Sequence, residues 1–211
     1  MYQSLASLFH DGVRPTFEQY VLATSLRTIG DGSLLRPARA AIEILYHFGE
    51  HYKAEKDPAF TPIHIEALCP GHKLLRNFVD AAKHHTINQN KPEISRAFQL
   101  SEALRITTFR DTQGLYMNNE ILAIATLDNG NEVDLLSVMV RVINFWGKQL
   151  FDDGLLPSRY SHIYTGETVV PRNMVLPPIE VKGTVGIPIS IKLIGRQYDY
   201  KTKEFKDVKF V

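Results

Sequence analysis

The sequence predicts an α+β protein: mainly a helical bundle, with a β-hairpin and a β-rich C-terminal tail. Three observations predict this class. Apolar residues recur at helical spacing over residues 37–53 and 133–151, strand-like alternation lies between residues 103 and 127, and helical periodicity disappears after Gly154. We therefore divide the 211 residues into a helical domain with an inserted hairpin, 1–154, and a β-rich extension, 155–211.

Composition narrows the class of protein further. With 44% hydrophobic and 22% charged residues, the chain can bury a sizeable core. A net charge of +1 argues against a protein built chiefly to bind duplex nucleic acid non-specifically. The single cysteine, Cys69, cannot form an internal disulfide, and neither a secretory signal nor a membrane span is evident. We expect a cytoplasmic protein without a membrane partner.

The helices are predicted from turn residues and apolar spacing. A short helix is expected over residues 1–12, and a second follows Pro15 from Phe17 to Ile29. Pro37 opens a helix that runs to Lys53, and Cys69-Pro70-Gly71 leads into another from His72 to His85. We assign Cys69 a structural role in that turn.

The second half of the chain predicts strands around one more helix. Residues 103–109 and 121–127 form the hairpin strands, and the helix over 133–151 follows a strong turn signal. Two further strands are expected over residues 187–200 and 204–211. The tail forms a small sheet in our preferred interpretation, and an arm that adds to a neighbouring chain in the alternative.

The His72–His85 helix gathers the most groups able to do chemistry. Its apolar stripe faces one side, and a polar row lies on the other, with further polar side chains beside it. The stripe contains Leu75, Phe78, Val79 and Ala82, the row contains His72, Arg76, Asp80 and His84, and Lys73, Asn77 and Lys83 flank it. We predict Arg76–Asp80 and Asp80–His84 pairs, the second of which would raise the pKa of His84. The row should face water unless a second surface covers it.

A second polar row is predicted on the Pro37–Lys53 helix. His47-Phe48-Gly49-Glu50-His51 matches H-x-x-E-H, in which two histidines one turn apart hold zinc and the glutamate activates water. A third zinc ligand would have to come from another element, and Asp80 and Glu66 are the candidates considered. A zinc-dependent hydrolase using His47, Glu50 and His51 is therefore an alternative, while the preferred interpretation needs no cofactor.

The stretch Arg76-Asn77…Asp80…Lys83-His84 resembles the HEPN superfamily, small helical domains common in bacterial defence and toxin–antitoxin systems. The D-A-A-K-H-H ending at residues 80–85, followed by a hairpin and a Trp-bearing helix, is also similar to a group of uncharacterised bacterial proteins. HEPN ribonucleases carry an arginine and then a histidine four to six residues further on. Here seven residues separate Arg76 from His84, which on one helix places them about 12 Å apart along the axis and about 80° apart around it.

The resemblance implies a homodimer in which two such helices face each other and act on nucleic acid. Arg76 would then steady a phosphate of RNA, and His84, aided by Asp80, would shuttle the proton of the 2′-hydroxyl without a metal. Lys73, Asn77 and Lys83 would contribute to binding. A defence or toxin–antitoxin component is the implied biological role. The remaining alternative is a non-catalytic interaction module that binds a protein partner through its tail and polar rows.

Overall fold

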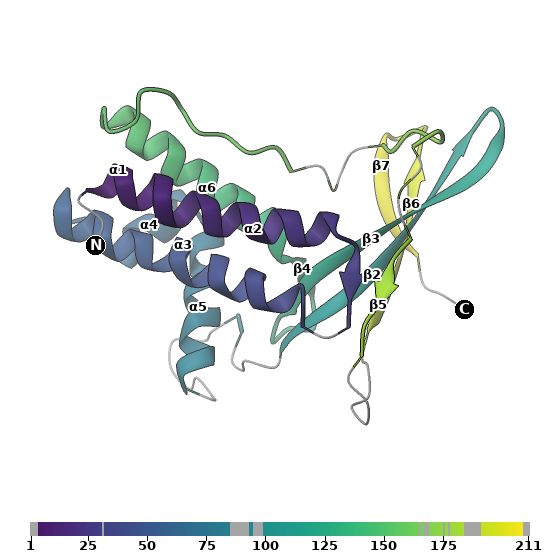
Figure 1. Cartoon of the computed structure of the whole chain (residues 1–211), viewed down its shortest axis with the longest axis horizontal. Coiled ribbons are helices and arrows are strands. Elements are labelled where there is room, and N and C mark those ends of the chain that lie inside the picture. The colour runs from purple at the N-terminus through teal and green to yellow at the C-terminus, as the bar shows by residue number, and fades with distance from the viewer. Residues whose placement is uncertain are drawn as a thin grey trace.

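The computed structural model has a mixed α+β architecture, as the sequence predicts. The helices form one end of the molecule, and the larger sheet forms the other end (Figure 1). The described residues are 4–30, 32–84, 93–94, 99–164, 166, 169–174, 176, 178–183 and 191–208, with the backbone alone for 82–84.

A continuous helical stretch opens the described chain, although the sequence predicted a break around Pro15. It consists of α1 (Leu5–Leu8), the π-helical turn η1 (Phe9–Val13) and α2 (Arg14–Ser25). Proline normally interrupts a helix because it lacks an N–H and its ring clashes with the carbonyl four residues earlier. Here Pro15 follows the wider π-helical turn and occupies the first turn of α2, where the missing N–H is tolerated. The predicted break was therefore wrong.

The remaining helices surround an apolar core centred on Trp146, whose side chain is fully buried. They are α3 (Leu35–Glu55), α4 (Pro62–Leu68), α5 (Gly71–His84) and α6 (Leu135–Asp152). The predicted apolar stripe of α3 is confirmed, because its members from Ala38 to Tyr52 are buried. Asp134 caps α6 by accepting a hydrogen bond from the N–H of Leu136 at 2.9 Å.

The larger sheet joins the hairpin and the tail in the order β4-β3-β2-β6-β7. Its strands are β2 (Leu100–Asp111), β3 (Gly114–Thr126), β4 (Glu132–Asp134), β6 (Lys192–Asp199) and β7 (Glu204–Val208). Strand β2 pairs antiparallel with β3 along its whole length, so β2 extends beyond both of its predicted bounds and β3 begins well before its predicted start. The predicted tail strands are present in β6 and β7, whose outer ends, residues 187–190 and 209–211, lie outside the described residues. Strand β6 lies parallel to β2, with Ala103 opposite Lys192.

A small parallel pair links the end of the first helical stretch to the tail. Strand β1 (Thr28–Ile29) pairs with β5 (Glu180–Val181). Arg27, just before β1, adopts a positive φ of 55°, which ends the helical path earlier than the predicted Ile29. The pairing holds a part of the tail beside the helices.

The two faces of the larger sheet have different neighbours. Ile121, Ala123 and Ala125 belong to the same apolar core as the helices. Because side chains alternate along a strand, Glu120 lies on the opposite face, where it pairs with the buried Arg105 at 2.8 Å. The chain after α6 crosses toward the sheet (Figure 1) and closes over this second face through the contacts described next.

Side chains at the outer end of the hairpin hold the crossing segment in place. The hydroxyl of Tyr116 donates to the carbonyl of Val170 at 2.9 Å, and Arg172 forms two hydrogen bonds of 2.8 Å with Asp111. Arg172 also lies over the ring of Tyr116, 4.9 Å from its centroid. These contacts attach the described part of the segment to the hairpin.

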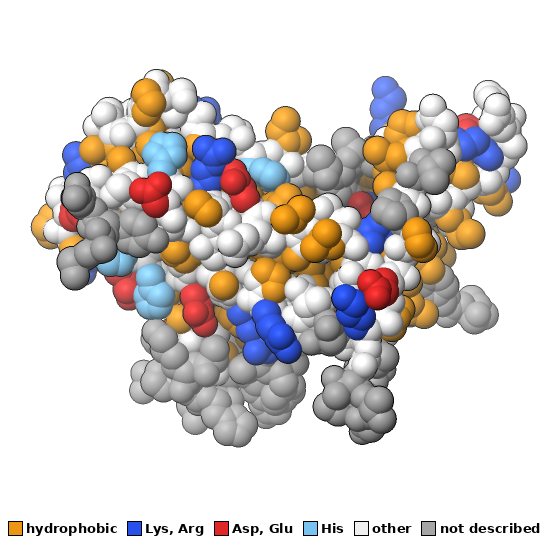
Figure 2. All heavy atoms as spheres, viewed as in Figure 1, with side chains coloured by type: hydrophobic (Ala, Val, Ile, Leu, Met, Phe, Trp, Pro, Cys, Tyr) orange, Lys and Arg blue, Asp and Glu red, His pale blue; other side chains and the backbone are white. Residues whose placement is uncertain are grey.

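The surface carries charges of both signs over the helical part. On the face in Figure 2, the visible histidines lie over the helices, and acidic and basic side chains are interspersed there. Within the described residues, none of the helices has both the length and the apolar character needed to cross a membrane.

Candidate functional site

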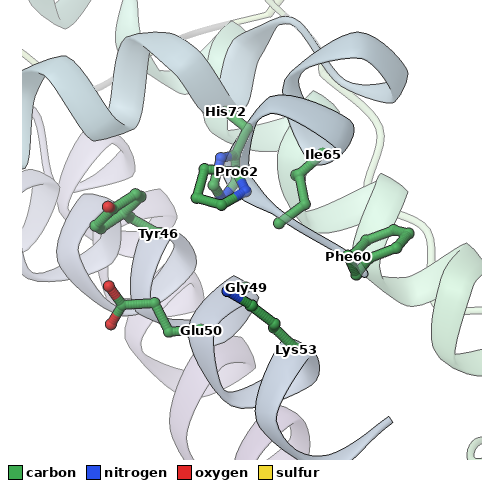
Figure 3. A pocket seen from close by; sticks show the side chains of 8 residues that line it. All are labelled: Tyr46, Gly49, Glu50, Lys53, Phe60, Pro62, Ile65 and His72. Carbon is green, nitrogen blue, oxygen red and sulfur yellow. The ribbon is translucent and has the colours of Figure 1, made fainter. Parts of the chain in front are cut away.

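A pocket of about 310 Å³ lies where α3, α4 and α5 meet. Its lining residues come from one face of α3, from the start of α4 with the preceding loop, and from the first turn of α5. They are Tyr46, Gly49, Glu50, Lys53, Phe60, Pro62, Ile65 and His72. Figure 3 shows Tyr46 and Glu50 on one side of the pocket and Phe60 on the other. The α3 residues follow the spacing i, i+3, i+4, i+7, which places them along a single helical stripe.

His72 forms a buried polar part of this pocket. Its side chain is 1% exposed, and among the described residues neither ring nitrogen has a hydrogen-bond partner. Burial lowers the pKa of His72 to about 4, an effect that the nearby backbone carbonyl of Tyr46 only partly opposes. The ring is therefore neutral at pH 7, with one N–H donor and one bare acceptor nitrogen. The prediction that His72 faces water was wrong, because α3 and α4 cover this end of α5.

Gly49 makes room for the His72 ring. A methyl group built on Gly49 would lie 3.0 Å from Cδ1 of Ile65, 3.2 Å from Nε2 of His72 and 3.3 Å from Cζ2 of Trp146. These separations are tighter than ordinary packing allows. The glycine that weakens α3 as a helix thus lets α5 and the Trp146 ring approach it closely.

The H-x-x-E-H row lies at the exposed side of the pocket. Nδ1 of His47 contacts Oε2 of Glu50 at 2.7 Å, and the Glu50 side chain is 59% exposed. His51 is exposed as well. Among the described residues, no group of three His, Cys, Asp or Glu side chains is placed to hold a metal ion. Glu66, one of the two residues considered as a third zinc ligand, instead forms an ion pair with a cation of α5.

That cation is Arg76, whose predicted partner was Asp80. Nη1 of Arg76 lies 3.0 Å from Oε1 of Glu66, because α4 packs against α5 and brings its carboxylate to the row. The predicted Arg76–Asp80 pair was therefore wrong. Burial raises the pKa of Glu66, although the charge of Arg76 opposes the shift.

The remaining members of the α5 row have different environments. Asn77 is buried, so its predicted place on an exposed binding face was wrong. Lys73 pairs with Glu93 at 3.0 Å, and Asp80 is half-buried. The side chains of Lys83 and His84 lie outside the described residues, and the predicted Asp80–His84 pair lies there with them.

Comparison with protein-family models, curated proteins and solved structures finds no match for this chain. The site is therefore interpreted from its own geometry. The sequence did not predict five of the lining residues, namely Tyr46, Lys53, Phe60, Pro62 and Ile65. A signal for part of the site was present in α3, where a glycine lies between the large apolar residues Leu45, Phe48 and Tyr52 and marks a close approach.

Cys69 has the structural role that was predicted. Its side chain is buried, and burial raises the pKa of the thiol, which keeps it protonated and unreactive at neutral pH. Its N–H donates to the carbonyl of Ile65 at 2.7 Å, and its carbonyl accepts from the N–H of His72 at 2.9 Å. The residue therefore joins α4 to α5 and sets the direction in which His72 enters the pocket.

Two other hollows in the described part of the chain offer no comparable buried polar group. One of about 420 Å³ adjoins Phe60, but its Tyr52 hydroxyl already donates to Asp153 at 2.6 Å and accepts from Gln149 at 3.0 Å. A groove of about 610 Å³ along β6 is lined mainly by exposed side chains of β4, β6 and β7. The His72 pocket differs from both in presenting a buried polar group without a partner.

Proposed function

We propose that the protein binds a small molecule in the pocket between α3, α4 and α5. The observation that carries the proposal is the buried His72 ring, whose nitrogens have no hydrogen-bond partner among the described residues. An unsatisfied buried donor or acceptor costs about 1–3 kcal/mol. A bound molecule that satisfies the ring would recover much of that cost, and the cavity of about 310 Å³ is large enough to hold one.

Binding fits this site better than acid–base catalysis does. A general base works best when its pKa lies near the operating pH, whereas burial lowers the pKa of His72 to about 4. Catalytic histidines also usually have a carboxylate that orients the ring, and the carboxylate on the pocket lining, Glu50, contacts His47 instead. His72 is therefore assigned to ligand recognition.

Gly49→Ala tests the proposal, with benzyl alcohol as the probe. The added methyl group lies against Nε2 of His72 and Cδ1 of Ile65, so we expect binding to weaken by roughly tenfold or more. The measurement is a titration followed by the imidazole ¹⁵N and ¹H NMR signals of His72. Glu43→Ala, on the exposed side of α3, is the matched control and should bind as the wild type does.

Two outcomes would contradict the proposal. One is a wild-type protein whose His72 signals do not respond to this probe or to its shape-matched analogues. The other is a folded Gly49→Ala variant that binds the probe as tightly as the wild type. Far-UV circular dichroism and a thermal melt establish that the variant is folded before its affinity is compared.

A second candidate is metal-independent cleavage of RNA by a HEPN-like dimer. In its favour, Lys73, Arg76 and Asp80 keep partly exposed side chains along α5. Phosphate binding by Arg76 would require it to leave Glu66, its partner at 3.0 Å. This proposal predicts RNA cleavage in EDTA by a dimer, with loss of activity in His84→Ala and not in the exposed control His51→Ala. A monomer by solution mass, or full activity of His84→Ala, would overturn it.

A further inference from the structure

We infer that the pocket selects compact, uncharged molecules that carry an O–H or N–H donor, such as alcohols, phenols or primary amides. This inference rests on the proposed function and names the class of ligand that the same site would take. It follows from the hydrogen-bonding needs of His72, from the cost of placing a charge beside it, and from the size and walls of the cavity.

The first step concerns the bare nitrogen of His72. A neutral imidazole carries a single proton, so one ring nitrogen is always an acceptor. The backbone carbonyl of Tyr46 is itself an acceptor and can serve only the protonated nitrogen. The indole N–H of Trp146, the neighbouring ring at 6.1 Å between centroids, donates to no group among the described residues, His72 included. The Tyr46 carbonyl, which partly opposes the fall of the His72 pKa, lies where it can accept from the ring N–H, so the need left for a ligand to meet is a donor to the other nitrogen.

The second step concerns charge. A carboxylate has acceptors only, so it offers nothing to the bare nitrogen and would lose its hydration on entering. An ammonium carries donors, but the same burial that keeps His72 neutral also disfavours a positive charge beside it. The charged groups of the pocket, Glu50 and Lys53, are exposed, so they lie where water still solvates them. An ionic group on a ligand would therefore remain at the mouth.

The third step concerns size and shape. A dry cavity of about 150 Å³ in another protein accommodates benzene, and this pocket is about twice that volume at roughly 310 Å³. Its apolar walls are Phe60, Pro62 and Ile65, with the Tyr46 ring 5.5 Å from the ring of His72 between centroids. A single ring with one short polar substituent matches both the volume and these walls.

Four molecules of nearly equal shape test the inference on the full-length protein: benzyl alcohol, toluene, benzylammonium and benzoate. Each is titrated at pH 7 while the ¹⁵N and ¹H signals of the His72 ring are followed. We expect benzyl alcohol to bind roughly fivefold or more tightly than toluene, because it alone adds an uncharged donor. Benzylammonium and benzoate should bind more weakly than either.

The variant His72→Leu isolates the hydrogen bond from the shape of the cavity. In this variant, followed by the methyl signals of Ile65, the preference for benzyl alcohol over toluene should disappear while toluene still binds. Equal binding of toluene and benzyl alcohol to the wild type, or binding of either ion as tightly as the alcohol, would overturn the inference and leave the proposed function standing. Failure of all four molecules to bind would remove the proposed function as well.

Discussion

Replacing His72 by leucine should leave the ligand-free protein at least as stable as the wild type at pH 7.5. The substitution removes two buried nitrogens that have no partner among the described residues and substitutes an apolar side chain inside an apolar pocket. Removing an unsatisfied polar group in this way is neutral to stabilising, by up to about 2 kcal/mol. Urea denaturation at pH 7.5 measures the difference in the free energy of unfolding.

The same variant should lose much of the acid sensitivity of the wild type. At about pH 7.5 and above the ring is largely neutral in both the folded and the unfolded chain, so it adds little pH dependence. As the pH falls from 6.5 to about 4, the unfolded chain binds a proton that the folded chain cannot, and the free energy of unfolding decreases. The gap between the two pKa values corresponds to a loss of about 3 kcal/mol that is complete below pH 4.

A second histidine on the neighbouring helix provides the control for this experiment. His51 is exposed on α3, so His51→Leu should retain the pH dependence of the wild type. Burial also raises the pKa of the Glu66 carboxyl, so carboxylates contribute to the pH dependence as well. Subtracting the His72→Leu curve from the wild-type curve removes their contribution. Parallel curves for the wild type and His72→Leu between pH 6.5 and 4 would show that the ring is not held neutral by burial.

Arg105→Met should destabilise the protein by about 3–5 kcal/mol. Only 8% of the Arg105 side chain is exposed, and it pairs with Glu120 at 2.8 Å and lies 3.8 Å from Asp134. Its guanidinium also donates to the carbonyl of Gly166, in the segment that crosses the sheet. Without the guanidinium, the negative charges of Glu120 and Asp134 would lose their cationic partner beneath that segment. This lowers the free energy of unfolding far more than the loss of an exposed ion pair does. Chemical denaturation at pH 7 gives the magnitude.

Arg172→Met is the matched control, because Arg172 joins the same segment to the same sheet near its surface. It forms a bidentate pair with Asp111 at 2.8 Å, but both side chains remain in contact with solvent, which screens their attraction. We expect a much smaller loss of stability than for Arg105→Met. Equal losses of stability in the two variants would mean that the burial of Arg105 and its ion pairs contributes little to the stability of the fold.

Local patterns were sufficient to predict most of the elements. The helix expected over residues 133–151 is α6 over Leu135–Asp152, because its apolar stripe matches the helical period over five turns. The hairpin also follows from local signals, namely alternation on both sides of a Gly-containing turn. Pro15 was misleading, since nothing in the local pattern indicates the π-helical turn that accommodates it.

The candidate site was predicted only in part, although both of its helices were. His72 and Glu50 belong to two polar rows that lie opposite the apolar stripes of their own helices, so each row was expected to face water. Contacts between α3 and α5 place both residues on one pocket, which Phe60 of the preceding loop and Ile65 of α4 close. A helical wheel describes one helix alone and contains no information about what packs on its polar side.

The amino-acid pattern alone thus determined which segments are helices and strands, because periodicity and turn residues act over a few neighbouring positions. Only the tertiary structure decided that β6 lies parallel to β2, which joins residues some 90 positions apart. It also decided that His72 lies in a pocket and is buried to 1% exposure rather than solvated. Both results depend on contacts between distant segments, whose geometry is set by the packing of the whole core.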